Sequence, residues 1–155
     1  MSAAPDWSKL LPMLPGPIHA MLLTPLFIGF FIKEWGALER AMARVIALHL
    51  ELNRVEYLER FLDLNADQQL KALAGALGDT PAAVEIVARA NRLVLVRNDV
   101  VHGYWGSINE SDDFVVYRKK RKIAGFTEMP MSINDVMGAV SDVQRLACDL
   151  FEFKR

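Results

Sequence analysis

The chain has 155 residues, of which 52% are hydrophobic and 24% are charged, and its formal net charge is −1. This composition is that of an ordinary globular protein and excludes a disordered chain. The length fits one domain that buries about two thirds of the surface exposed in the unfolded chain. The single cysteine, Cys148, excludes an internal disulfide, and we expect a reducing, cytoplasmic environment. The sequence has neither a metal-ligand spacing nor a glycine-rich phosphate loop, so we expect no cofactor.

The N-terminal region is the most apolar part of the chain. From Leu10 to Ile32, only His19 can carry a charge. A membrane-spanning helix needs about 20 mainly apolar residues in succession, and prolines at positions 12, 15, 17 and 25 interrupt this stretch. We therefore expect residues 1–23 to form a proline-rich arm that packs on the domain or on a partner, followed by one helical domain over residues 24–155. Membrane association through residues 10–32 is the alternative.

A long first helix is predicted after this arm. Thr24-Pro25 is a typical helix start, with threonine at the N-cap and proline at the first helical position. The helix should continue to about His49. Its apolar residues recur at intervals of three and four and so form one stripe, which comprises Ile28, Ile32, Trp35, Met42 and Ile46.

Further helix signals follow in order. Residues 51–63 keep a helical but more charged pattern, so the first helix bends or restarts there. Asn65 followed by Gln68 resembles a capping box for a helix to about Leu77, which Gly78 ends. A helix from Thr80-Pro81 should reach His102, with Gly103 as its stop. A last helix should be capped by Ser132 and Asp135.

The segment 104–127 differs from the rest of the chain. Phe114–Tyr117 is β-prone, and residues 109–113 have the composition of a turn. We expect a short β-hairpin or extended insertion that carries an unbroken basic run on its second arm, namely Arg118, Lys119, Lys120, Arg121 and Lys122. The predicted fold is all-α: a four- to five-helix up-and-down bundle with this insertion before the last helix.

One helix places polar residues where apolar ones are expected. Over residues 81–102, a period of about 100° per residue gathers Glu85, Arg89, Arg92 and Asp99 on a solvent face. Arg97 falls on the opposite, apolar face. An arginine there must be paired or must face a cleft. Glu39 is the natural partner, because it is the one acid in the apolar stripe of the first helix, and a purely structural Arg97–Glu39 pair is one interpretation.

His102 lies five residues after Arg97, which is about 140° around a helix. The two side chains can converge only through the reach of the arginine, a distorted last turn or a second subunit. A histidine in a last turn is also favoured by the helix dipole, without any functional implication. Arg44 and His49 repeat the spacing, but an apolar residue follows Arg44 and no glycine follows His49, so we interpret that copy as an ordinary helix face.

The stretch Arg97-Asn98-Asp99-Val100-Val101-His102 resembles the Arg-x4–6-His motif of the HEPN (higher eukaryotes and prokaryotes nucleotide-binding) superfamily. A polar residue typically follows the arginine in that superfamily, as Asn98 does here. The position of the motif at the end of the helix before the last one is similar, as is the first-helix segment 29–39. The resemblance covers about residues 25–151. It implies a metal-independent RNA endonuclease, often a toxin or defence component with an antitoxin partner.

The same resemblance implies roles for three residues. Arg97 would orient the scissile phosphate, and His102 would activate the ribose 2′-OH or protonate the leaving oxygen. Asn98 would fix the histidine or the phosphate. One histidine cannot be base and acid in the same step, so a homodimer with two motifs across one cleft is expected. A non-catalytic HEPN-like binding or regulatory module is the alternative.

The basic run suggests where RNA would bind. Its five cations could hold the phosphate backbone, while Tyr104, Trp105 or Tyr117 stack on bases. A solvated hairpin arm is the competing interpretation, because adjacent side chains of a strand alternate between its two faces.

Overall fold

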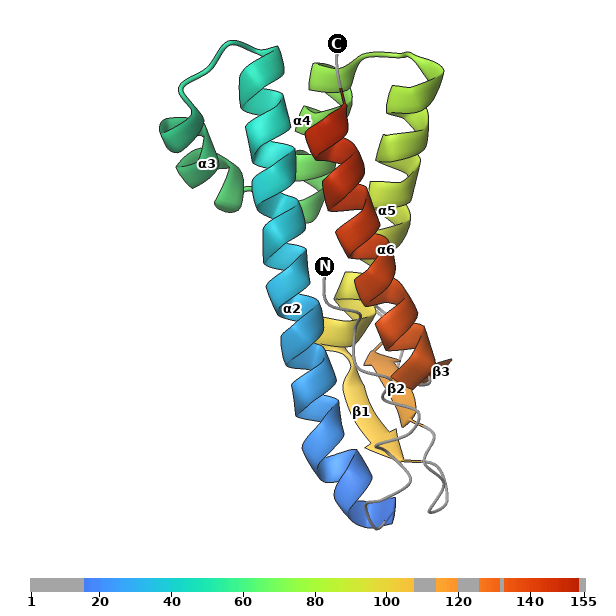
Figure 1. The fold of residues 1–155 in the computed structure, drawn as a ribbon. Helices are drawn as coiled ribbons and strands as arrows, with labels where there is room; N and C mark the ends of the chain where they lie inside the picture. Colours follow the sequence, from blue (N-terminus) through green and yellow to red (C-terminus); the bar gives the residue numbers. More distant parts are fainter. Residues whose placement is uncertain (1–15, 108–113, 120–125, 132, 154–155) are drawn as a thin grey trace.

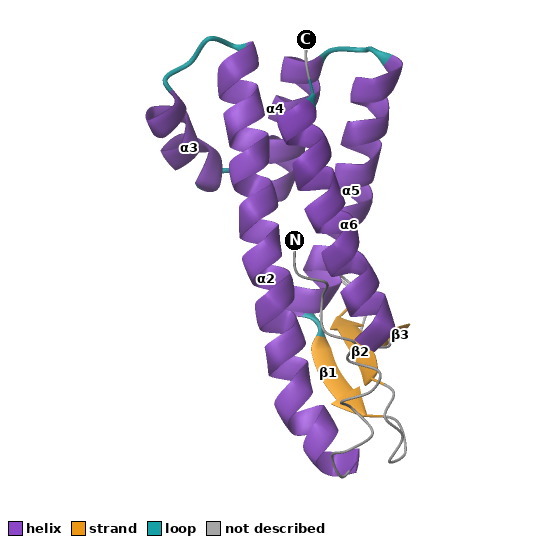
Figure 2. Cartoon of the chain, in the orientation of Figure 1, coloured by secondary structure: helices purple, strands orange, loops and turns teal. Residues whose placement is uncertain are grey.

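The computed structural model describes residues 16–107, 114–119, 126–131 and 133–153. This part of the chain is mainly helical, which confirms the all-α class, and a small antiparallel sheet accompanies the helices (Figures 1 and 2). The elements in order are α2 (Gly16–His49), α3 (Arg54–Leu62), α4 (Ala66–Leu77), α5 (Pro81–His102), β1 (Tyr104–Ser107), β2 (Phe114–Lys119), β3 (Phe126–Met131) and α6 (Ile133–Glu152).

Helix α2 is the longest element, with 34 residues, or about 50 Å at the usual rise per residue. It begins at Gly16, so the prediction of a start at Thr24 was wrong, and Pro25 lies inside the helix. An interior proline removes one backbone hydrogen bond. The cost is offset by an apolar face that begins two residues later and is buried throughout, formed by Phe27, Phe31, Trp35, Leu38 and Met42.

The core forms where the other helices pack on α2, which contacts all four of them. In Figure 1, α6 lies alongside α2 and runs in the same direction, whereas α5 runs in the opposite direction. The predicted stripe of α2 was partly misplaced: Trp35 is buried as expected, but Ile32 is 48% exposed. No helix of the described residues is long and apolar enough to cross a membrane.

Local capping signals set most helix ends as predicted. The chain leaves α2 through Glu51, which has a positive φ of 56°, and restarts as α3. Asn65 and Gln68 form the capping box of α4, with both reciprocal bonds at 3.0 Å. Thr80 caps α5 by accepting a hydrogen bond from Ala83 N at 3.2 Å. Ser132, the expected cap of α6, lies outside the described residues.

Gly103 ends α5, but without the left-handed conformation that usually favours glycine at this place. Its φ and ψ are −74° and 151°, so the backbone is already extended as it enters β1. Trp105 stabilises the turn, because its indole Nε1 donates a hydrogen bond to Val100 O at 3.0 Å. The strand therefore starts directly against the end of the helix.

The three strands form one antiparallel sheet in the order β1-β2-β3. The register pairs Tyr104 with Tyr117 and Phe114 with Met131. The third strand extends beyond residue 127, where the insertion was expected to end. It contains Pro130, which the sheet tolerates because β3 is an edge strand.

Candidate functional site at the end of helix α5

The last turns of α5 bring Arg97, Asn98 and His102 together within one chain. Arg97 Nη1 lies 3.0 Å from His102 Nε2 and donates a second hydrogen bond to Asn98 Oδ1 at 3.2 Å. The helix is continuous through His102. The Arg97 and His102 side chains therefore meet because the arginine side chain is long enough, and not through a distorted last turn or a second subunit.

The chemistry of the two groups fixes the direction of the contact. A guanidinium has donors only, so His102 Nε2 must accept, and the neutral ring carries its proton on Nδ1. His102 is exposed, while Arg97 and Asn98 are half-buried. Among the contacts of the described residues, Arg97 uses Nη1 alone. Its Nη2 and Nε groups keep the planar fork that binds a phosphate with two parallel hydrogen bonds.

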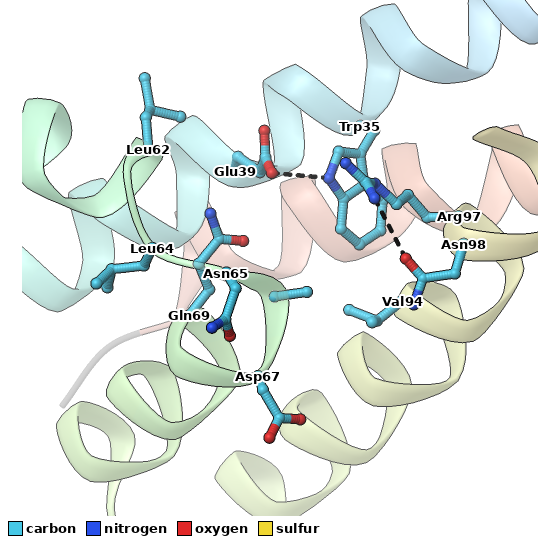
Figure 3. A pocket seen from close by; sticks show the side chains of 11 residues that line it. Trp35, Glu39, Leu62, Leu64, Asn65, Asp67, Gln69, Val94, Arg97 and Asn98 are labelled. Carbon is cyan, nitrogen blue, oxygen red and sulfur yellow. Dashed lines mark hydrogen bonds between the residues drawn. The ribbon is translucent and has the colours of Figure 1, made fainter. Parts of the chain in front are cut away.

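A cavity of about 450 Å³ adjoins this cluster, and Arg97 and Asn98 form part of its wall (Figure 3). Trp35 and Glu39 of α2 line it as well, together with the α3–α4 turn and the first turns of α4. An arginine on an apolar helix face was expected to be paired or to face a cleft. Arg97 faces this cavity, which other polar side chains also line. The contribution of α4, which includes Gln69, was not predicted, because no motif marks these residues.

Glu39 does not form the expected direct pair. Its Oε1 accepts a hydrogen bond from Trp35 Nε1 at 2.9 Å, and no ion pair joins it to Arg97 among the described contacts. Trp35 and Glu39 are four residues apart on α2, which is the spacing of neighbours on a helix face. Glu39 and Arg97 therefore line the same cavity with no hydrogen bond or ion pair between them among the described contacts.

The predicted solvent face of α5 is only partly exposed. Arg92 pairs with Glu85 at 3.6 Å on the surface, and Arg89 pairs with Asp149 of α6. Asp99, however, is 5% exposed, so its assignment to solvent was wrong. The helical period gives the angle of a residue but not what covers it, and the sheet that follows Gly103 folds back beside α5.

The second Arg–His copy has a different environment. His49 is buried, and its Nδ1 donates to Val45 O at 2.9 Å, while its ring packs 5.9 Å from that of Phe153. Arg44 is exposed and lies 5.0 Å from the centre of the Phe151 ring. The two side chains make separate contacts, which agrees with the interpretation of an ordinary helix face.

The sheet register places the backbone of the first two residues of the basic run, Arg118 and Lys119, at the end of the sheet that follows α5. Tyr104 follows the end of α5 by one residue and pairs with Tyr117, so Arg118 lies at the same end of the sheet as Gly103. The backbone of Arg118 and Lys119 belongs to β2. Lys120, Arg121 and Lys122 lie outside the described residues.

The described residues contain no group of three or more histidine, cysteine or acidic side chains placed to hold a metal ion. Comparisons of this chain with protein-family models, with curated proteins and with solved structures found no match. The function must therefore be argued from the geometry of the cluster and its cavity.

Proposed function

We propose that the chain is a metal-independent RNA endonuclease of HEPN type that acts as a homodimer. The observation that carries this proposal is the contact of Arg97 with His102 at 3.0 Å. It joins a phosphate-binding group and a proton acceptor on an exposed helix end, beside a cavity. Cleavage by the ribose 2′-OH requires just these two activities, proton transfer and stabilisation of a developing anion.

In the proposed reaction, the free donors of Arg97 bind the non-bridging oxygens of the scissile phosphate. When RNA binds, Arg97 Nη1 turns from His102 Nε2 to the phosphate, and the lone pair that this frees on Nε2 takes the proton of the 2′-OH, whose oxygen attacks phosphorus. The bond from phosphorus to the 5′-oxygen breaks, and an acid protonates the leaving oxygen. The products are a 2′,3′-cyclic phosphate and a 5′-hydroxyl. Asn98 holds the arginine fork through its Oδ1.

A second copy of the chain would supply the acid. When His102 has taken a proton it cannot donate another in the same step, so a two-fold dimer with both clusters facing one RNA strand resolves the requirement. Positively charged residues from Arg118 onward would hold the strand, and Tyr104 would stack on a base. We propose further that the enzyme serves as a toxin or defence component, controlled by an antitoxin protein, in the cytoplasm.

The second candidate is a non-catalytic helical module of the same type, for binding or regulation. It is favoured by the cavity that Glu39 and Arg97 share, because side chains of opposite charge that line one space can attract each other. This candidate predicts no RNA cleavage and a large loss of stability when Arg97 is removed.

The deciding experiment is incubation of the purified protein with RNA in EDTA, with the Arg97→Ala and His102→Ala variants alongside. Cleavage that leaves 2′,3′-cyclic phosphate ends and is lost in both variants is expected. Arg44→Ala is the matched control, because it removes the arginine of the other Arg–His copy and should leave cleavage unchanged. Full activity in His102→Ala would refute the mechanism.

A further inference from the structure

The cavity beside Arg97 has the features of a ligand site. Its volume of about 450 Å³ lies in the range of small-molecule pockets. It lies between α2, the α3–α4 turn, α4 and α5, and Arg97 belongs both to its wall and to the Arg97–His102 contact. A phosphate bound at Arg97 would therefore leave the attached nucleotide beside the opening of the cavity.

Two acceptor groups of the wall are held in fixed orientations. Gln69 is 3% exposed, and its Nε2 donates to Phe61 O at 3.2 Å. The amide end left for the cavity is thus the acceptor Oε1. Glu39 accepts from Trp35 with one lone pair of Oε1, so the other lone pair of Oε1 and those of Oε2 remain as acceptors on a negatively charged group. Figure 3 shows Glu39, Gln69 and Arg97 around the same space.

Apolar groups supply the remaining surface. The indole of Trp35 is 5% exposed and is held in place by its bond to Glu39. Leu64 and Val94 line the cavity from the α3–α4 turn and from α5. A wall with an aromatic ring, aliphatic side chains and directed polar groups at its edge is how proteins bind unstacked RNA bases.

The acceptors select among the four bases. The Watson–Crick edge of guanine carries two adjacent donors, N1–H and the N2 amino group, which a carboxylate can accept in parallel. Adenine and cytosine offer one amino group beside an acceptor nitrogen. Uracil presents one N–H between two carbonyl oxygens, which a carboxylate repels. The donors of guanine are thus the best match to Glu39.

We propose that this cavity binds a guanine base of the RNA strand, next to the bond that Arg97 and His102 cut. The proposal rests on the proposed nuclease function and gives it a base preference. Glu39 is the specificity-determining residue, and Gln69 accepts an additional hydrogen bond from the base.

The test uses short RNA oligonucleotides that differ at a single base, in EDTA. We expect cleavage next to guanine to exceed cleavage next to uracil by about ten- to a hundredfold, the usual effect of one two-bond base contact. Inosine, which lacks the N2 amino group, should be cut less well than guanosine. Equal cleavage next to all four bases would overturn the guanine proposal and leave the nuclease function intact.

The Glu39→Gln variant gives a sharper result than simple loss of activity. Its amide oxygen would still accept from Trp35 Nε1, so its amino group would face the base and oppose the donors of guanine. We expect the preference to shift from guanine towards uracil or cytosine. The matched control is Glu34→Gln on the same helix, since Glu34 pairs with Lys33 at 3.2 Å outside the cavity. An unchanged guanine preference in Glu39→Gln would refute the role of Glu39.

If no RNA is cut, measurements of oligonucleotide binding can still test the guanine pocket separately from the nuclease function. Oligonucleotides with 2′-deoxy sugars cannot be cleaved by 2′-OH attack, and their affinity can be measured by fluorescence anisotropy. Stronger binding of the guanine-containing strand, lost in Glu39→Gln, would support the pocket even for an inactive protein. No difference between the bases in this measurement would count against it.

Discussion

The stability of the Arg97→Ala variant separates the two candidate functions. In the structure, this substitution removes the hydrogen bonds from Nη1 to Asn98 and to His102, at 3.2 and 3.0 Å. Each such bond contributes about 0.5–1.5 kcal/mol to the free energy of unfolding. Because His102 is exposed and Asn98 is half-buried, water replaces part of what is lost. We expect a total loss of about 1–2 kcal/mol. Breaking a buried ion pair would instead cost about 3–5 kcal/mol.

Urea unfolding followed by circular dichroism measures this difference. With a denaturant slope of about 2 kcal/mol per molar urea, the expected loss lowers the midpoint by about 0.5–1 M. RNA cleavage by the same variant should fall by at least about a hundredfold, the usual effect of removing one donor to a developing anion. Arg92→Ala is the control, because the contact of Arg92 among the described residues is a surface pair with Glu85 at 3.6 Å. Both the urea midpoint and the rate of cleavage should barely change.

A double-mutant cycle with Glu39→Ala tests whether Arg97 and Glu39 form a structural pair. Since Glu39 and Arg97 make no ion pair among the described contacts, the two losses should add to within about 0.5 kcal/mol. A drop of more than about 1.5 M in the urea midpoint of Arg97→Ala, together with a large coupling to Glu39, would establish the structural pair. The binding-module interpretation would then be favoured.

Three further predictions concern the fold and its pH dependence. Asn65→Ala removes the side-chain half of the α4 capping box and should lower the free energy of unfolding by about 1 kcal/mol in urea titrations. Leu146→Ala opens a cavity at a fully buried position and should cost about 2–5 kcal/mol, whereas truncation of the 54% exposed Phe151 should cost far less; equal losses would contradict the observed core. Burial raises the pKa of Tyr57 above its usual value of 10.0, so above that pH the unfolded chain releases a proton that the native protein keeps. The contribution of protonated Tyr57 to the free energy of unfolding is complete below about pH 10 and is lost as the pH rises through the higher native pKa. Urea midpoints measured at several pH values should therefore fall less steeply for Tyr57→Phe than for the unmodified protein.

Local signals predicted the part of the fold that depends on neighbours in sequence. The ends of α4 and α5 follow from Asn65, Gly78, Thr80 and Gly103, whose capping groups act within one helical turn. The start of α2 was missed, because a proline is usually a boundary. Here Pro25 is retained inside the helix by the long buried face that follows it.

The predictions that failed concern features that depend on contacts between residues distant in sequence. The strand that contains Pro130 has little intrinsic preference for a strand and is held by pairing with β2. The burial of Asp99 likewise depends on what packs over α5, which the helical period does not specify. For the site, the sequence singled out Arg97, Asn98 and His102. The cavity could not be foreseen because α2, α4 and α5 each supply only one or two of its polar side chains.

The two Arg–His copies show that spacing alone does not decide what such a pair does. In α2 the histidine is turned into the core and its ring nitrogen is bound to Val45 O, so no substrate can reach it without opening the bundle. In α5 the helix ends immediately after His102, and the extended Gly103 directs the chain into the sheet. That ending leaves the imidazole exposed while Arg97 remains at the cavity wall. In the proposed nuclease, a proton acceptor, an anion-binding fork and a pocket for the adjoining base would then lie within reach of one another, as cleavage at a chosen nucleotide requires.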